Sequence, residues 1–292
     1  MHTGPWIFMQ KPRETSERED KSLPPVTLIH DNETAKALGY QGGFVGGLHL
    51  LSLATGAIDA TFGHRWYEGG TLGIRNKTPV FESELRVEWE EALPKEGESR
   101  RLNFYLINRE GEQSNPGWAA LSKPGEKPAL PWERNPEKHI SIGNDALPEM
   151  KVGASRTPFE ARVGLKDTVA RLDVISDRTW WFRYASPWGE PILTPFEVCF
   201  MLYQGVPQSP SNPLRSPRLR VSMDAGTDLV MYKPMFVDRT YIMKARLVDK
   251  WQTEKSVFWV TEFSYVDDKG EQTALMRAYT AHIIRNLAPV NP

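Results

Sequence analysis

A run of glycines precedes an apolar stretch and could supply hydrogen-bond donors for carbonyl chemistry. Residues 42–47 end in two adjacent glycines, Gly46 and Gly47, where a helix is predicted to begin. The first N–H groups of a helix have no partner within it and carry the positive end of its dipole. Because no side chain blocks the approach, these N–H groups could bind a carbonyl oxygen that gains negative charge. Alternatively, the glycines only let the helix pack closely against a sheet.

A lone acid, Glu197, stands among apolar neighbours in a second predicted helix. A buried carboxylate is costly unless it is paired, and its pKa is often raised, so Glu197 could act as a general base. It could equally be a first-turn acid that the helix dipole favours. His49 takes the matching place in the first helix when Val45 is aligned with Leu193. It is either a catalytic group or a core histidine bonded to a carbonyl.

Aromatic side chains are dense from Trp180 to Trp188 and could line an acyl or aromatic pocket. In this run Arg183 could meet a carboxylate or phosphate, and Trp181 could form a wall. The hydroxyl of Tyr184 needs a partner if it is buried, which makes it a candidate ligand contact. Packing within a strand core is the alternative for most of these aromatics.

Several other classes of protein and site are disfavoured by composition. The chain has 292 residues with 36 Lys and Arg against 37 Asp and Glu, so no strong field exists to hold a nucleic acid or an anionic membrane. One cysteine, Cys199, excludes an internal disulfide. The six histidines show no metal-ligand spacing, and no phosphate-binding glycine motif or nucleophile elbow occurs. We therefore expect no metal and no cofactor.

The stretch from Phe44 to Phe62 carries no Lys, Arg or Glu and has about the length of a membrane span. It contains His49, Asp59 and several glycines, however, which favours a buried helix at the centre of a globular fold. The first residues lack the basic and apolar runs of an export signal. We expect a cytoplasmic protein that contacts no membrane.

The chain contains an internal repeat. Lys77–Phe81 recurs as Tyr232–Phe236, with the Pro-x-Phe units 155 positions apart, and Ile107–Gln113 recurs as Val266–Gln272, displaced by 159. Each glycine of the second pair lies in a polar turn between two strand-like runs, which is typical of a β-hairpin. Matches that keep the same order along the chain indicate a duplicated unit.

Each repeat is predicted to be an α+β unit, in which one long helix lies against a curved antiparallel sheet. The predicted helices are Gly46–Phe62 and Pro195–Gln204. The predicted strands around the hairpins are Arg101–Asn108, Trp118–Ser122, Val257–Val266 and Gln272–Ile284. We divide the chain into an arm (1–25), a first unit (26–123), a linker (124–152) and a second unit (153–292).

The segment from His30 to His49 resembles the MaoC-like family of (R)-specific enoyl-CoA hydratases and acyl dehydratases. In that family an Asp, an Ala and a Gly–aromatic pair precede the Gly that opens the central helix. Those places are taken here by Asp31, Ala35, Gly39, Tyr40 and Gly46 or Gly47. The resemblance covers most of residues 26–122 and, more weakly, 155–286, and implies a tandem (double) hotdog fold.

The resemblance also implies an acid–base pair in the segment before the helix. The family signature Asp-x-Asn-Pro-x-His is absent from both halves, but His30 lies one residue from the expected histidine and Asp31 follows it. His30 and Asp31 are therefore the implied catalytic residues, with Tyr40 at the substrate. In the alternative, Asp31 caps a helix beginning near Glu33 and His30 is merely exposed.

We therefore expect a lyase, a hydratase or dehydratase that adds or eliminates water on an acyl thioester of the enoyl-CoA type or a related carbonyl compound. Its partners would be this small molecule and, in a homodimer, a second copy of the chain. The alternatives are a hotdog thioesterase using Glu197, a diverged hotdog protein that binds a ligand without turnover, and an elimination or isomerisation on a non-CoA substrate.

Overall fold

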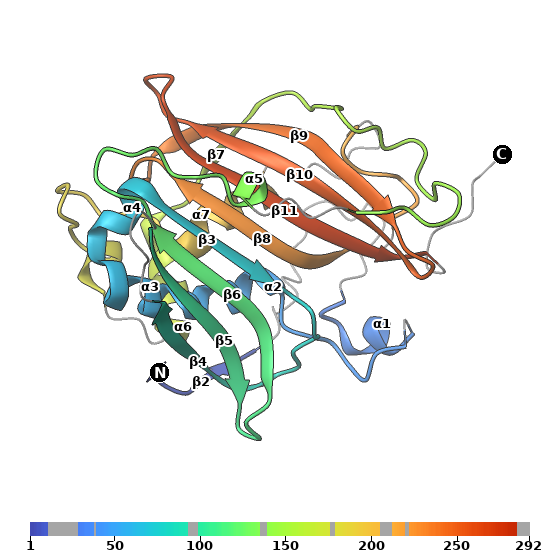
Figure 1. Ribbon diagram of the computed structural model, residues 1–292, viewed down its shortest axis with the longest axis horizontal. Coiled ribbons are helices and arrows are strands. Elements are labelled where there is room, and N and C mark those ends of the chain that lie inside the picture. Colours follow the sequence, from blue (N-terminus) through green and yellow to red (C-terminus); the bar gives the residue numbers. More distant parts are fainter. Residues whose placement is uncertain are drawn as a thin grey trace.

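The computed structural model describes residues 1–10, 29–37, 39–92, 99–134, 139–175, 179–204, 212–219 and 222–284. Its main element is an 11-stranded sheet in the order β1-β4-β5-β6-β3-β8-β11-β10-β9-β7, with β2 also pairing with β4. Helices α2, α3, α6 and α7 lie on one face of this sheet, and the short helix α5 lies on the other (Figure 1).

The strands of the first half are β1 (His2–Thr3), β2 (Ile7–Met9), β3 (Gly70–Arg75), β4 (Ser83–Ala92), β5 (Arg100–Asn108) and β6 (Gln113–Leu121). Those of the second half are β7 (Phe159–Arg162), β8 (Met223–Met231), β9 (Thr240–Gln252), β10 (Ser256–Val266) and β11 (Gln272–Ile283). The order β4-β5-β6-β3 is repeated as β9-β10-β11-β8, so the two halves have the same topology.

The helices of the first half are α1 (Asn32–Ala37), α2 (Gly47–Leu51), α3 (Thr55–Phe62) and α4 (Trp66–Gly69), with 3-10 turns η1 (Ser52–Ala54) and η2 (Gly63–Arg65). The linker carries α5 (Pro131–Arg134), and the second half has α6 (Leu165–Val174), η3 (Trp180–Phe182), α7 (Pro195–Phe200) and η4 (Met201–Tyr203). The predicted helix Gly46–Phe62 is thus interrupted by one 3-10 turn. There the Ser52 hydroxyl donates back to the carbonyl of His49 at 2.5 Å, a contact that bends helices.

The repeat in the sequence is a repeat in three dimensions. Before each central helix, a backbone N–H donates to the carbonyl of the middle residue of the Pro-x-Phe segment. The N–H of Val45 donates to Val80 O at 2.7 Å, and that of Leu193 donates to Met235 O at 2.7 Å. The predicted alignment of Val45 with Leu193 is therefore confirmed.

The two hairpins also correspond. Gly111 and Gly270 both adopt a left-handed backbone, with φ of 81° and 79°, which glycine tolerates best. In both turns the side chain of the residue three positions earlier, Asn108 or Asp267, accepts the N–H that follows the glycine at 2.8 Å. The hairpins that the sequence predicts are therefore present.

The halves join through β3 and β8, whose pairing places Gly73 opposite Asp228, 155 positions later. The carboxylate of Asp228 is 1% exposed and accepts hydrogen bonds from Arg75 at 2.8 and 3.0 Å and from the Tyr279 hydroxyl at 2.8 Å. A Cβ at position 73 would lie 2.6 Å from this carboxylate, so only glycine fits. One hydrophobic core then continues through both halves.

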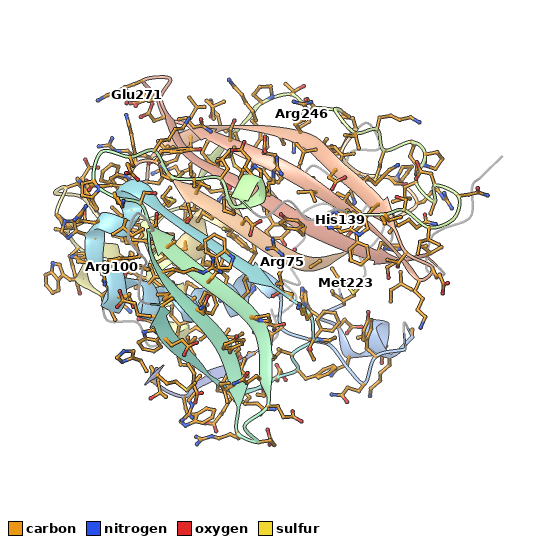
Figure 2. All side chains as sticks on the ribbon, in the orientation of Figure 1. Arg75, Arg100, His139, Met223, Arg246 and Glu271 are labelled. Carbon is orange, nitrogen blue, oxygen red and sulfur yellow. The ribbon has the colours of Figure 1, made fainter. Side chains whose placement is uncertain are left out.

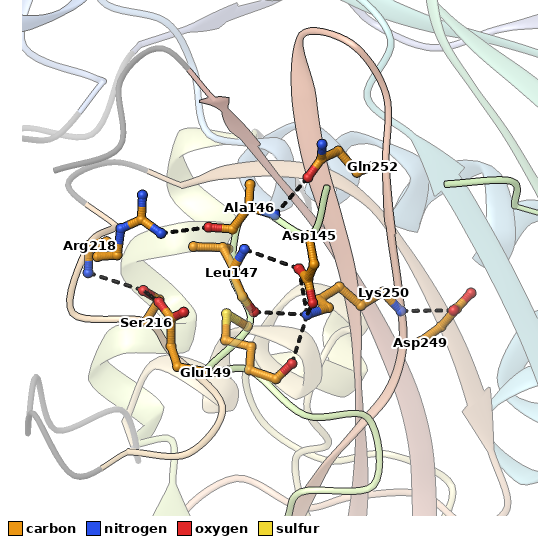
Figure 3. A network of polar contacts seen from close by, with 10 residues as sticks. Asp145, Ala146, Leu147, Glu149, Ser216, Arg218, Asp249, Lys250 and Gln252 are labelled. Carbon is orange, nitrogen blue, oxygen red and sulfur yellow. Dashed lines mark hydrogen bonds and ion pairs between the residues drawn. The ribbon is translucent and has the colours of Figure 1, made fainter. Parts of the chain in front are cut away.

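The linker is tied to the second half by Lys250 of β9 (Figure 3). Its ammonium donates to both carboxylate oxygens of Asp145 at 2.9 and 2.6 Å and to the carbonyls of Leu147 and Met150 at 2.8 and 2.9 Å. At the N-terminal end of the chain, β1 and β2 pair with β4. Part of the predicted N-terminal arm therefore belongs to the sheet. Residues 11–28, which include most of that arm, lie outside the described part.

Candidate functional site

His30 lies in the turn before α1, and its imidazole is partly buried beside Phe44. Its Nδ1 is 2.5 Å from the carbonyl oxygen of Phe44. Since a carbonyl only accepts hydrogen bonds, the proton of the neutral ring must sit on Nδ1. The Nε2 atom is then unprotonated and can accept a proton, as a general base must.

The glycines that precede α2 bring His30 to the start of that helix. A Cβ on Gly43 would lie 2.1 Å from the carbonyl oxygen of His30, so the close approach of these backbones requires glycine. A Cβ on Gly46 would lie 3.2 Å from His49 Nδ1 and 3.6 Å from His30 Nε2. Both imidazoles therefore flank Gly46.

The helix that begins at Gly47 has no side-chain cap of its own. Gly46 occupies the N-cap position with an extended backbone and makes no side-chain capping bond. Among the described residues, the N–H groups of Gly46 and Gly47 donate to no acceptor, and the N–H of Leu48 is close enough to Asp224 to lower the pKa of its carboxyl group. Two donors with the positive end of the helix dipole thus remain beside His30.

Asp224 reaches this point from β8 of the second half. A Cβ on Gly47 would lie 2.9 Å from Asp224 Cβ and 1.9 Å from Asn76 Nδ2. The hydroxyl of Tyr203 is 3.2 and 3.1 Å from the two carboxylate oxygens of Asp224. Burial raises the pKa of this carboxyl, although Tyr203, His30 and the Leu48 N–H act in the opposite direction.

Asn76 adds an amide to the same place. Its Nδ2 donates to the backbone carbonyl of Asp224 at 3.2 Å, while its buried Oδ1 has no partner among the described residues. The site around Gly46 and Gly47 therefore combines a basic imidazole, a carboxyl group, an amide and free backbone donors.

Apolar and aromatic side chains form one side of this site. Tyr40 and Phe44 pack edge to face with ring centroids 5.3 Å apart, and Phe44 packs on Phe81 at 6.4 Å. The Tyr40 hydroxyl donates to the sulfur of Met223 at 3.0 Å, across the two halves. Met223 is labelled in Figure 2 at the end of β8 that faces α1.

Asp31 directly precedes α1, and its carbonyl accepts the N–H of Ala35 at 2.9 Å, as an N-cap residue does. This matches the capping alternative, although the helix begins at Asn32 rather than near Glu33. A catalytic role for Asp31 stays a prediction.

His49 is held neutral by its surroundings. Burial, the charge of Arg171 and the proximity of His30 lower its pKa to about 3. Arg171 Nη2 donates to His49 Nε2 at 3.0 Å, which leaves the ring proton on Nδ1, the atom that faces Gly46. His49 can therefore donate a hydrogen bond near Gly46 but is a poor base.

Glu197 has a structural task in the second half. It is 2% exposed and forms a capping box with Thr194: Thr194 N donates to Glu197 Oε2 at 3.1 Å, and Glu197 N donates to Thr194 Oγ1 at 3.4 Å. Burial lowers the pKa of Arg171, and the charge of Glu197 acts in the opposite direction and raises it. This is the first-turn alternative that the sequence left open.

The aromatic run lies at the other end of the central helix of the first half. Trp181 packs edge to face on His64 of η2 at 5.9 Å, and Arg183 forms an ion pair with Asp173 at 2.8 Å. Tyr184 is 60% exposed, and its ring packs against that of Trp180 at 4.2 Å with the two planes tilted by 35°. The structure therefore does not bring these three predicted substrate-binding residues to His30.

The start of α7 is the equivalent, in the second half, of the start of α2. Trp188 takes the place of Tyr40 in the second half. Its Nε1 donates to a carboxylate oxygen of Glu68 at 3.0 Å, whereas the Tyr40 hydroxyl donates to Met223. Thr194 and Pro195 stand where the first half has Gly46 and Gly47, and the capping box closes the helix end. A surface pocket near this second site is lined by Trp188, Phe236 and Tyr241 and by a charged rim. It lacks the histidine and the free helix donors.

Among the described residues, no three His, Cys, Asp or Glu side chains are grouped so that they could hold a metal ion. Within the same part of the chain, no helix has the length and apolar character needed to cross a membrane. The thiol of Cys199 is buried, which raises its pKa and keeps it protonated.

No model of a known family and no curated protein matches the sequence. Solved structures do match. A protein from Chloroflexus aurantiacus named as a MaoC domain protein dehydratase gives a TM-score of 0.59 at 11% identity, covering 88% of this chain and 87% of that one. A MaoC-like dehydratase gives 0.54 at 10% identity over 85% and 87%. A conserved hypothetical protein from Mycobacterium tuberculosis, described as a double hotdog, gives 0.55 at 13% identity over 88% of both chains.

This chain has a double hotdog fold. At such low identity the likeness shows the fold alone, and the predicted fold class is confirmed. In this double hotdog the sequence pointed to His30, His49, Tyr40 and the two glycines, which the structure gathers at one helix end. It missed Asp224, Tyr203 and Asn76. Asn76 and Asp224 are brought together by the pairing of β3 with β8, and Tyr203 follows α7, which packs on α2; no local sequence signal exists for these long-range contacts.

Proposed function

We propose that this double hotdog protein adds water to, or eliminates water from, an acyl thioester of the enoyl-CoA and 3-hydroxyacyl-CoA type. The observation that carries the proposal is the hydrogen bond from His30 Nδ1 to the Phe44 carbonyl, because it leaves Nε2 as a base beside unpartnered donors. The dehydratases among the similar structures make this reaction class a reasonable starting point.

The reaction needs two kinds of help from the protein. Removing a proton next to a thioester carbonyl places negative charge on the carbonyl oxygen, which the N–H groups of Gly46 and Gly47 would stabilise. The proton itself needs a base within reach, and the unprotonated Nε2 of His30 supplies one. The aromatic side of the site, formed by Tyr40, Phe44 and Phe81, would hold the acyl chain.

The thioesterase alternative would use Glu197 to activate water. That carboxylate is engaged with Thr194 at the start of α7, in the second half, and forms part of a helix cap. The arrangement favours water addition at His30 over thioester hydrolysis at Glu197. The cytoplasmic location and the homodimer remain predictions.

A panel of enoyl thioesters of increasing chain length separates the two functions. A hydratase lowers the near-ultraviolet absorbance of the conjugated thioester without releasing thiol, and the product is the 3-hydroxyacyl thioester. Release of free thiol at the rate of substrate loss would instead establish a thioesterase. Absence of both changes across the panel would contradict the proposed function.

A further inference from the structure

The carboxyl group of Asp224 lies where a second acid–base residue would be needed. The family signature that the sequence lacks would place an acid shortly before the histidine, and none lies there. We propose that Asp224, which comes from the second half of the chain, is the second acid–base residue of the site and works opposite His30. This inference rests on the proposed function.

The position of Asp224 is fixed from three sides. Tyr203 of η4 donates to its carboxylate, with distances of 3.2 and 3.1 Å to the two oxygens, and the nearby N–H of Leu48, in the first turn of α2, lowers the pKa of this carboxyl group. Asn76 holds its backbone carbonyl at 3.2 Å. These contacts come from both halves and place the carboxyl group next to Gly47.

The electrostatic surroundings suit an acid that exchanges a proton. Burial raises the pKa of the Asp224 carboxyl, so a larger fraction is protonated near neutral pH than for an exposed aspartate. The titratable groups that face it are His30, Tyr203 and Cys199. Tyr203 and Cys199 both have raised pKa values, mainly through burial, and stay neutral.

The duplication shows that this carboxyl group is specific to one site. With the offset of 155 that relates β3 to β8, the counterpart of Asp224 is Gly69 at the end of α4. The second half therefore has a glycine at the position equivalent to Asp224, and the start of α7 lacks the glycine pair. A purely structural residue shared by the duplicated unit would be expected at both positions.

A balanced step follows for hydration. The oxygen of water bonds to the β-carbon of the enoyl thioester while one of its protons passes to His30 Nε2. The electron pair of the double bond moves toward the thioester carbonyl, where the Gly46 and Gly47 N–H groups stabilise it. The protonated Asp224 then delivers a proton to the α-carbon. Solvent returns a proton to Asp224 and removes one from His30, and dehydration runs through the same steps in reverse.

The test compares Asp224→Asn with Asp59→Asn in enoyl thioester hydration. Asparagine keeps an oxygen that can accept from Leu48 and Tyr203 but cannot exchange a proton. Asp59 is a matched control because it also accepts from a tyrosine, Tyr67 at 2.9 Å, at the far end of the same helical segment. We expect Asp224→Asn to lower kcat by about 100-fold or more, and Asp59→Asn to stay within about threefold of the wild type.

A second variant keeps the test valid if Asp224→Asn fails to fold. Removing the hydroxyl in Tyr203→Phe takes a donor from the carboxylate, so the pKa of Asp224 should rise further. The alkaline limb of kcat/KM for hydration, which requires protonated Asp224, should then move to higher pH by roughly half a unit or more. An unchanged limb would overturn the inference.

The outcomes separate the two proposals. If the wild type hydrates the thioester, His30→Asn does not, and Asp224→Asn retains near wild-type kcat, Asp224 only caps the helix and the inference is wrong while the proposed function stands. If the wild type hydrates no thioester of the panel, the proposed function fails, and the inference fails with it.

Discussion

His49 and Glu197 occupy equivalent positions in the two halves, and Arg171 of α6 acts on both. Arg171 donates to His49 Nε2 at 3.0 Å, and the charge of Glu197 opposes the loss of the Arg171 proton. The central helices α2 and α7 meet here, and the ring of His49 packs edge to face on Phe196 at 5.4 Å. Arg171 thus lies between the two helices, and burial together with its charge keeps His49 neutral beside the site.

The depressed pKa of His49 predicts a pH dependence of stability. In the unfolded chain this imidazole takes up a proton near pH 6.5, but in the folded chain only near pH 3. The unfolded state therefore binds more protons between these values, and stability falls as pH is lowered from about 6.5, by at most about 1.4 kcal/mol per pH unit. Urea unfolding at pH 7.5 and at pH 5 measures this change in the free energy of unfolding.

The control is His49→Gln, which keeps an acceptor for Arg171 but does not titrate. Its free energy of unfolding should fall less between pH 7.5 and pH 5 than that of the wild type. Equal losses in the two proteins would show that other groups cause the pH dependence.

The capping box predicts that Glu197 matters for stability more than for turnover. Glu197→Ala removes the acceptor of the Thr194 N–H at a buried helix start and should cost about 1–2 kcal/mol of unfolding free energy. Glu197→Gln keeps an acceptor oxygen and should cost less. Both variants, measured below their unfolding temperature, should hydrate the thioester within about threefold of the wild type. Loss of turnover in a folded Glu197→Gln would instead assign the base to Glu197.

Much of this architecture could be predicted from the sequence because its signals are local. In both halves an apolar helix is followed by a hairpin with a glycine turn, at Gly111 and at Gly270. The alignment of Val45 with Leu193 pairs two residues whose N–H groups make equivalent hydrogen bonds. The alternation of apolar and polar residues from Leu85 on is another local signal, and Leu85 and Val87 are buried in β4.

The composition of the site could be predicted only in part. His30 precedes the glycines in sequence, so a local motif could point to it. Asp224 and Tyr203 reach the same point only because β8 pairs with β3 and because α7 packs on α2, and these are long-range contacts. The aromatic run near Tyr184 was expected at the ligand on composition alone, and composition does not tell which end of a helix a segment covers.

The close approach at Gly43 gives a steric prediction. In Gly43→Ala the new Cβ would overlap the His30 carbonyl oxygen at 2.1 Å, so the His30 turn must shift away from α2. We expect a loss of about 1–3 kcal/mol in stability and a larger proportional loss in turnover. Gly56→Ala is the matched control because nothing lies within 4 Å of its Cβ in α3. That variant should gain up to about 1 kcal/mol and keep its activity.

The most direct measurement of the central claim is the hydration rate of His30→Asn with a saturating enoyl thioester. Asparagine can still donate to the Phe44 carbonyl but offers no basic nitrogen, and His64→Asn, at the opposite end of the helical segment, serves as control. We expect kcat to fall by about 100- to 10,000-fold in His30→Asn and to change by no more than about twofold in His64→Asn. A folded His30→Asn protein that hydrates the thioester at nearly the wild-type rate would contradict the central claim.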